Sequence, residues 1–354
     1  MSIREISAAA ITDAVEALCI EANTQLPADV KAALDKAEAN EPWPLAKETL
    51  GLLQQNLCVA ADKDLPICQD TGMACVFIEL GQDAHINGDL TDAVNEGVRR
   101  GYEKAYLRKS ITADPLQRVN TGDNTPAFLT VHLVPGSGCK ITVAPKGAGS
   151  ENMSRLAMLK PADGVEGVKK FVLDTVEQAG ANPCPPVVLG IGIGGSFDHC
   201  AALAKKALLR PLDTPNADPY YATLEKVLLD AINATGFGPQ GFGGATTCLG
   251  VAIEQKPTHV ACLPVAVNIS CHVTRRASRE GRAMAKPNID ISLDGVGESA
   301  RSAKTKRASI DIPLDGEEPR RPVTDITMKE LEFVNRHHEE YKELRRRARE
   351  QGGR

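Results

Sequence analysis

The sequence is poor in the features that nucleic-acid-binding proteins use. Aromatic residues make up only 4% of its 354 residues, and the formal net charge is −5. Base-stacking surfaces need aromatic side chains, and binding to a phosphate backbone needs concentrated Lys and Arg. No dense basic stripe covers the body of the chain. We therefore expect no nucleic acid among its partners.

Long apolar segments are missing as well. No uninterrupted apolar run approaches the roughly 18 residues that are needed to span a bilayer. Residues 1–11 contain no basic stretch followed by an apolar core, so they do not resemble a secretory signal. The sequence thus predicts a cytoplasmic protein without a membrane partner.

The ten cysteines include no CxxC pair. Zinc ribbons and thioredoxin-like sites use such pairs, so the pattern disfavours both. Disulfide bonds are not expected in a chain without an export signal. Binding of a metal or a cluster becomes the leading use for some of the thiols, and these ligands must then come from loops far apart in the sequence.

Local patterns predict an α/β (mixed α+β) fold, with a helical N-terminal part followed by mixed sheet layers with flanking helices. Residues 3–60 are rich in Ala, Leu and Glu and are interrupted at Pro27 and at the Pro42/Pro44 pair, which predicts several helices. The pattern over Asp89–Lys109 predicts an amphipathic helix that carries Arg108 near its end.

Two later segments, Ala127–Val134 and Cys139–Ala144, flank a Pro-Gly-Ser-Gly turn and predict a β-hairpin. Further strands are expected at 73–80, 187–193, 251–254 and 259–267, and further helices at 165–179, 198–209 and 219–235.

The composition changes near residue 280, where charges begin to dominate. We therefore divide the chain into residues 1–280, which carry the candidate site on loops between the layers, and a charged extension, 281–354. Within the extension, weak strand patterns occupy 289–293 and 310–314. Residues 326–349 predict a terminal helix whose narrow apolar stripe favours a solvated surface position.

The loop Cys68-Gln69-Asp70-Thr71-Gly72 places a soft metal ligand, an amide, a carboxylate and a hydroxyl side by side. Such a loop suits a metal next to a small polar substrate. The alternative is a polar turn with a buried thiol, since free cysteines are commonly buried. A second stretch, Lys146–Asn152, puts glycines and a lysine before a short helix. It suits an anion, with an ordinary glycine-rich turn as the alternative.

The segment Gly190-Ile191-Gly192-Ile193-Gly194-Gly195 fits the G-x-G-x-x-G pattern of dinucleotide-binding folds. Such a site also needs an acidic residue at the end of a second strand, about 20 positions further on. A loop broken by prolines occupies that place, at 210–215. An NAD-binding oxidoreductase is therefore only a minor alternative.

Cys68, Cys184 and Cys271 share a setting, because each lies in a loop beside a predicted strand. Cys184 lies between two prolines, and Cys271 is followed by His272 and two arginines. Thiolates suit iron–sulfur clusters, and basic neighbours lower thiol pKa values. Arg275 and Arg276 are candidates for tuning such a cluster, with an ordinary surface role as the equal alternative.

Several motifs, in this order, resemble the α-type region of class I fumarate hydratases, the iron–sulfur hydro-lyases that include tartrate dehydratases. The motifs are Cys68-Gln69-Asp70-Thr71-Gly72, Val119-Asn120-Thr121-Gly122-Asp123-Asn124-Thr125-Pro126-Ala127, Lys146-Gly147-Ala148-Gly149-Ser150-Glu151-Asn152, Cys184-Pro185-Pro186, Gly238-Pro239-Gln240-Gly241 and Ser270-Cys271-His272.

This resemblance covers roughly residues 5–280 and implies a 4Fe–4S cluster held by Cys68, Cys184 and Cys271. Four thiolates would saturate such a cluster, whereas three leave one iron open to act as a Lewis acid on the substrate hydroxyl group.

The resemblance also implies roles for five other residues. Asp70 would serve proton transfer, and Gln69 and Arg108 would bind substrate carboxylates. Lys146 and Asn152 are weaker candidates for the same cavity. The alternative for Arg108 is a solvated charge at a helix C-terminus.

In this family a β-type region, fused or separate, supplies further substrate-binding and catalytic groups, and residues 281–354 are too short and too charged to be that region. The resemblance therefore implies the α subunit of a hydro-lyase that acts on a small dicarboxylate in a homo- or hetero-oligomer with a β-type subunit. Hydration of fumarate to malate is favoured, and L(+)-tartrate dehydration is the alternative. A non-catalytic cluster-binding subunit also stays open.

Overall fold

The N-terminal part of the chain is helical, as the sequence predicts. The computed structural model describes residues 3–281, in which α1 (Ala8–Thr24), α2 (Ala28–Asn40) and α3 (Pro44–Asp62) follow one another. Pro27 directly precedes α2 and Pro44 opens α3, positions where the missing N–H of proline costs nothing. The short strand β1 (Arg4–Ser7) was not predicted, and it pairs in parallel with β3 (Ala84–Asn87).

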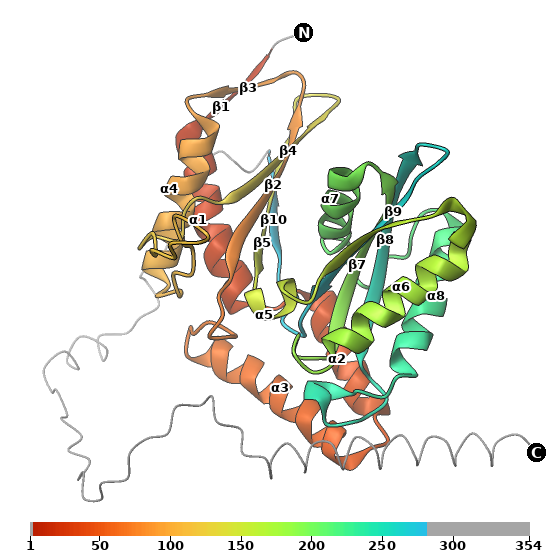
Figure 1. Cartoon of the computed structure of the whole chain (residues 1–354). Coiled ribbons are helices and arrows are strands. Elements are labelled where there is room, and N and C mark those ends of the chain that lie inside the picture. Colours follow the sequence, from red (N-terminus) through yellow and green to blue (C-terminus); the bar gives the residue numbers. More distant parts are fainter. Residues whose placement is uncertain (1–2, 282–354) are drawn as a thin grey trace, which may run out of the picture.

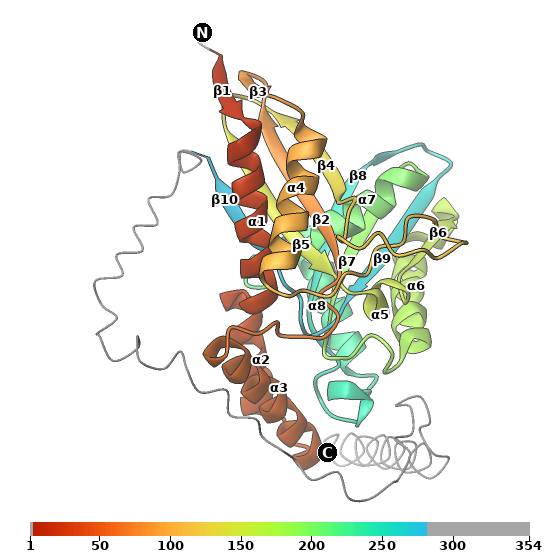
Figure 2. The same cartoon turned by 90° about the vertical axis from the view of Figure 1, so that its left-hand side faces the viewer.

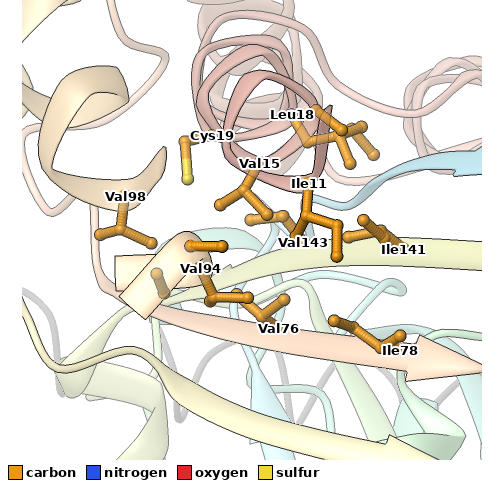
Figure 3. Packing of buried hydrophobic residues seen from close by; sticks show 14 of the residues in the cluster. Ile11, Val15, Leu18, Cys19, Val76, Ile78, Val94, Val98, Ile141 and Val143 are labelled. Atoms are coloured by element: carbon orange, nitrogen blue, oxygen red, sulfur yellow. The ribbon is translucent and has the colours of Figure 1, made fainter. Parts of the chain in front are cut away.

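The first large sheet has the strand order β10-β5-β2-β4. Its strands are β2 (Met73–Gly81), β4 (Phe128–Val134), β5 (Cys139–Lys146) and β10 (Ala277–Glu280). Helices α1 and α4 (Leu90–Lys104) cover one face (Figures 1 and 2). Figure 3 shows Ile11 and Val15 of α1 packed over Val76 and Ile141 of the sheet.

The predicted hairpin between residues 127–134 and 139–144 is wrong. Strand β2 lies between β4 and β5, parallel to β4 and antiparallel to β5. The turn after β4 bonds to the end of β2 instead, since the Gly81 amide donates to the Gly138 carbonyl at 2.7 Å. Apolar residues on both faces of β2 favour this central position, because a central strand is covered on both sides.

The second large sheet has the strand order β6-β9-β7-β8. Its strands are β6 (Arg155–Leu159), β7 (Val187–Gly195), β8 (Cys248–Thr258) and β9 (Leu263–Ser270). Helices α6 (Gly164–Ala179) and α8 (Pro219–Asn233) cover its outer face. Helix α7 (Phe197–Ala207) packs on the other face, between the two sheets (Figure 1).

The glycine-rich segment 190–195 belongs to β7 and does not form a phosphate-binding loop. Leu189 and Ile191 lie in the core with α6 and α8. The intervening glycines face α7, where a Cβ on Gly190 would lie 2.1 Å from the Ala204 carbonyl oxygen and one on Gly192 2.0 Å from that of Cys200. The glycines therefore allow close packing of helix and strand, which removes the basis of the NAD-binding alternative.

Helix α4 ends at Lys104, five residues before the predicted end. Tyr106 then adopts a positive φ of 54°, which redirects the chain so that Arg108 lies in a loop and not at a helix terminus. Helix α5 (Ala148–Glu151) is short, as expected. The predictions for 289–293, 310–314 and 326–349 lie outside the described residues. Over residues 3–281, no helix is long and apolar enough to cross a membrane.

Substitution Gly192→Ala should lower the free energy of unfolding by about 1–3 kcal/mol, because the added methyl group collides with the backbone of α7. Urea denaturation of the purified chain measures this. Gly138→Ala is the matched control, since a Cβ at Gly138 meets nothing within 4 Å. Equal stability of the two variants would contradict the packing role of Gly192.

Candidate active site

The loop that carries Cys68 is anchored by the N-terminal helices. The amide of Ile67 donates to the Asn23 carbonyl at 2.9 Å, and the Asn56 side chain donates to the Ile67 carbonyl at 2.8 Å. Ile67 is buried in a small apolar cluster with Val273, and Cys68 packs against the same cluster. Helices α1 and α3 therefore fix where this thiol lies.

The end of the same loop is fixed from the first sheet. Tyr102 of α4 donates to the carbonyls of Thr71 and Gly72, both at 2.9 Å. Thr71 in turn donates to the Arg108 carbonyl at 2.9 Å. Gly72 has a φ of +74°, and a Cβ there would lie 2.7 Å from the backbone of Lys146. Only glycine fits this contact between the loop and the end of β5.

The loop that carries Cys184 is held by backbone acceptors. The carbonyl of Cys184 accepts from the His272 amide at 3.3 Å and lies 3.0 Å from His272 Nδ1. The next carbonyl, that of Pro185, accepts from both the backbone and the side-chain amide of Gln240 at 2.7 Å. Cys184 itself has a φ of 54°. These bonds place Cys184 beside the segment that carries Cys271.

Contacts between the loops bring the three thiols together, since the amide of His272, next to Cys271, donates to the Cys184 carbonyl. Partial burial raises the pKa of the Cys184 thiol, and Cys271 and Cys68 raise it further. Cys68 and Cys271 also contact the same apolar cluster. The structure thus brings together the three cysteines that the sequence singled out, from three separate loops.

Their donor chemistry fits a cluster better than a single ion. No three His, Cys, Asp or Glu side chains among residues 3–281 are grouped to hold one metal ion. A cubane cluster takes each thiolate on a different iron, so its ligands stand further apart than those of one ion. The set of thiol donors is also the one that iron–sulfur clusters use.

Asp70 has both carboxylate oxygens engaged by backbone amides. Oδ1 accepts from Gly72 at 3.0 Å, and Oδ2 accepts from Ala148, in α5, at 2.9 Å. The side chain therefore has a fixed orientation and joins the cysteine loop to the Lys146–Asn152 stretch.

Three of the other predicted substrate residues, Gln69, Arg108 and Asn152, are exposed. Gln69 accepts from the Cys68 thiol at 3.5 Å, and Arg108 is joined through its carbonyl to Thr71. Gln69 and Arg108 thus adjoin the Cys68 loop, whereas Asn152 ends α5.

The sequence also matches known proteins. Residues 12–280 match the family model described as fumarate hydratase (Fumerase). This chain belongs to the fumarate hydratase family.

Its relatives in the family include α subunits of tartrate dehydratases. The chain is 43% identical over 284 residues to a Methanocaldococcus jannaschii protein named "Putative L(+)-tartrate dehydratase subunit alpha", a match that covers 78% of this chain and 99% of the relative. It is 32% identical over 272 residues to the L(+)-tartrate dehydratase subunit alpha of Escherichia coli K12, covering 76% of this chain and 89% of the relative.

Lys146 of this fumarate hydratase family member lies inside a buried network. Its Nζ donates to Ser150 at 2.7 Å and forms an ion pair with Glu151 at 3.3 Å. Glu151 also pairs with Lys205 of α7 and accepts from Asn268 at 2.8 Å. Burial lowers the pKa of Lys146, while the Glu151 carboxylate opposes that shift.

Sequence reasoning missed Glu151, Lys205 and Asn268. Only the place of Glu151 within the Lys146–Asn152 motif could have indicated it, because the other two lie in segments without a motif. The network connects α5, α7 and β9 behind the Cys271 loop.

The surface role considered for Arg275 and Arg276 is wrong. Arg275 is only 4% exposed and donates through Nη2 to the Asp70 carbonyl. Arg276 forms an ion pair with Asp29 of α2 at 2.7 Å. Both arginines therefore attach the Cys271 segment to the rest of the fold.

Substitution Asp29→Asn should lower the free energy of unfolding at pH 7, and this decrease should become smaller in acid. Burial opposes ionisation of Asp29. Hydrogen bonds from Arg276 and from the Leu212 amide outweigh this and lower its pKa below the ordinary value of 3.8. A carboxylate with a lowered pKa stabilises the fold above its unfolded pKa and loses that effect as the pH falls through the folded value.

Urea denaturation of the wild type and of Asp29→Asn, between pH 7 and the lowest pH at which both fold, measures this difference. The gap should narrow only as the pH passes below about 3.8. The control is Asp13→Asn, whose side chain is 63% exposed. A gap that widens in acid would contradict the role of the Asp29–Arg276 pair.

Proposed function

We propose that this chain is the α component of an iron–sulfur hydro-lyase that adds water to, or removes it from, a small dicarboxylate. The observation that carries the proposal is the convergence of Cys68, Cys184 and Cys271 beside Gln69 and Asp70. Membership of the fumarate hydratase family supports the reaction class.

In this proposal Cys68, Cys184 and Cys271 hold a 4Fe–4S cluster. When bound, such a cluster supplies an iron without a protein ligand, a Lewis acid that favours departure of the substrate hydroxyl group. Burial raises the pKa of the Cys271 thiol, but Arg275 and Lys146 act in the opposite direction and favour the thiolate that ligation requires.

The residues around the thiols supply the other functions that elimination of water needs. Gln69 and Arg108 bind the substrate carboxylates from the solvent side, with Asn152 as a further donor. Lys146 adds positive charge from the interior. Asp70 moves the proton at the carbon next to the one that carries the hydroxyl group, because its carboxylate is held in one orientation beside Gln69.

A β-type partner subunit completes the site in this proposal. Gln69, Arg108 and Asn152 face solvent in this chain, so a second surface is needed to exclude water from the substrate. The relatives carry "subunit alpha" in their names, which supports a multi-subunit enzyme. We assign catalysis to residues 1–280, a choice supported by the family match over 12–280, and treat 281–354 as a separate extension.

Two reactions are proposed. Interconversion of fumarate and malate follows from the family description, whereas the names of the relatives favour dehydration of L(+)-tartrate. Malate and L(+)-tartrate are both four-carbon dicarboxylates that lose water from adjacent carbons, so the same residues serve either reaction. Activity of the anaerobic complex with a β-type subunit on L-malate, fumarate and L(+)-tartrate separates them. A complex with an intact cluster and no turnover on any of them would favour the non-catalytic subunit.

Substitution Cys184→Ser should abolish the visible absorbance of the anaerobically reconstituted cluster, because a hydroxyl group is a much poorer ligand for iron than a thiolate. Cys68→Ser and Cys271→Ser should behave alike. The matched control is Cys58→Ser, a free exposed cysteine outside the motifs, which should keep full absorbance. Iron and sulfide analysis checks the result, and full iron retention in Cys184→Ser would remove it from the ligand set.

Substitution Asp70→Asn should leave the cluster in place and lower turnover by about 10²–10⁴-fold, the usual contribution of a general acid or base. Steady-state kinetics of the complex with its partner measures this, with iron content determined in parallel. The control is Asp114→Asn, since the Asp114 carboxylate accepts from the amides of Leu116 and Gln117 in an exposed turn. Turnover equal to that of the wild type would exclude Asp70 from the mechanism.

A further inference from the structure

Arg275 is a buried cation that has no carboxylate partner among the described residues. Its side chain is almost entirely removed from solvent, and no Asp or Glu within residues 3–281 forms an ion pair with it. Isolated buried charges are costly, so proteins normally pair them. The neighbouring cations are paired, since Arg276 is bound to Asp29 and Lys146 to Glu151.

The guanidinium group of Arg275 bridges two of the segments that form the site. Nη2 donates to the Asp70 carbonyl, and Nε donates to the Pro145 carbonyl at 3.4 Å. Both acceptors are neutral. Nη1 is buried and has no partner in the part of the chain that the structure describes. Nη2 therefore holds the Cys68 loop, whereas Nη1 remains available as a hydrogen-bond donor.

A small cavity of about 20 Å³ is lined by Cys75, Lys146, Ser270 and Arg275. It has room for about one water molecule, which could satisfy an N–H group of Arg275. Water carries no negative charge, so the charge of Arg275 is left for a bound anion to balance.

Arg275 lies between the segments that carry two of the proposed cluster ligands. It follows Cys271 by four residues, and the Asp70 carbonyl that it binds lies two residues after Cys68. The Asp70 carboxylate is already held by the amides of Gly72 and Ala148. A 4Fe–4S core with three thiolate ligands is a net anion. Its net charge and the hydrogen bonds to its sulfur atoms set its reduction potential.

We infer that Arg275 is a positioning residue that supplies the balancing charge for the cluster and ties it to the Gln69–Asp70 loop. This inference depends on the proposed function, because it needs the cluster. The Arg275 side chain then has two roles. Its charge retains the cluster and raises the reduction potential, and its bond to the Asp70 carbonyl holds the Gln69–Asp70 loop next to the cluster.

The test compares the anaerobically reconstituted full chain with Arg275→Gln and Arg275→Lys. Loss of the charge should make the reduction potential more negative in Arg275→Gln, and iron should be lost to a chelator about tenfold faster. Arg275→Lys keeps the charge but not the fork, so its potential should stay near that of the wild type while iron is still lost faster. A redox titration followed by electron paramagnetic resonance gives the potentials.

Arg210→Gln is the matched control. Arg210 is also largely buried, but it pairs with Glu225 of α8, so its loss should affect stability without changing the potential. If the reduction potential and the rate of iron loss of Arg275→Gln both equal those of the wild type, the inference is overturned, whereas the proposed function is not. If Arg275→Gln does not fold, a shifted potential in Arg275→Lys overturns it instead. A wild-type chain that binds no cluster would overturn both.

Discussion

The hydrogen bonds made by the segment that follows Cys271 hold the site together. His272 binds the carbonyl of Cys184, and Arg275 binds that of Asp70, two residues after Cys68. These contacts join loops that originate in the two large sheets and in the N-terminal helices. Because each acceptor is a backbone carbonyl, these bonds fix the path of the chain that carries the cysteines.

The layers around this segment follow from the need to bring distant loops to one point. Helix α7 packs between the sheets, and Gly190 and Gly192 bring it close to β7. The same helix carries Lys205 into the network of Glu151 and Lys146. The G-x-G-x-x-G segment, which resembles a dinucleotide-binding motif in the sequence, therefore serves helix packing. Through that packing it supports the polar network behind Cys271.

The sequence predicts the helices at the N-terminus and the shared setting of the three cysteines, because prolines, apolar periodicity and flanking strands are local signals. Strand order is not local. The turn at residues 135–138 indicates a hairpin, but nothing in it shows that β2 inserts between the two strands. Burial of Arg275 could not be predicted either, since charged residues are usually exposed and its acceptors lie on distant loops.

In the proposed function, three thiols hold a cluster with one iron open to the substrate. The decisive test is electron paramagnetic resonance of the anaerobically reconstituted and reduced chain, recorded with and without L-malate or L(+)-tartrate. The cluster signal should change when the correct dicarboxylate is added, since the substrate then reaches an iron without a protein ligand. A cluster signal that no dicarboxylate alters would contradict the open iron, and the absence of any cluster would leave Cys68, Cys184 and Cys271 as a group of ordinary thiols.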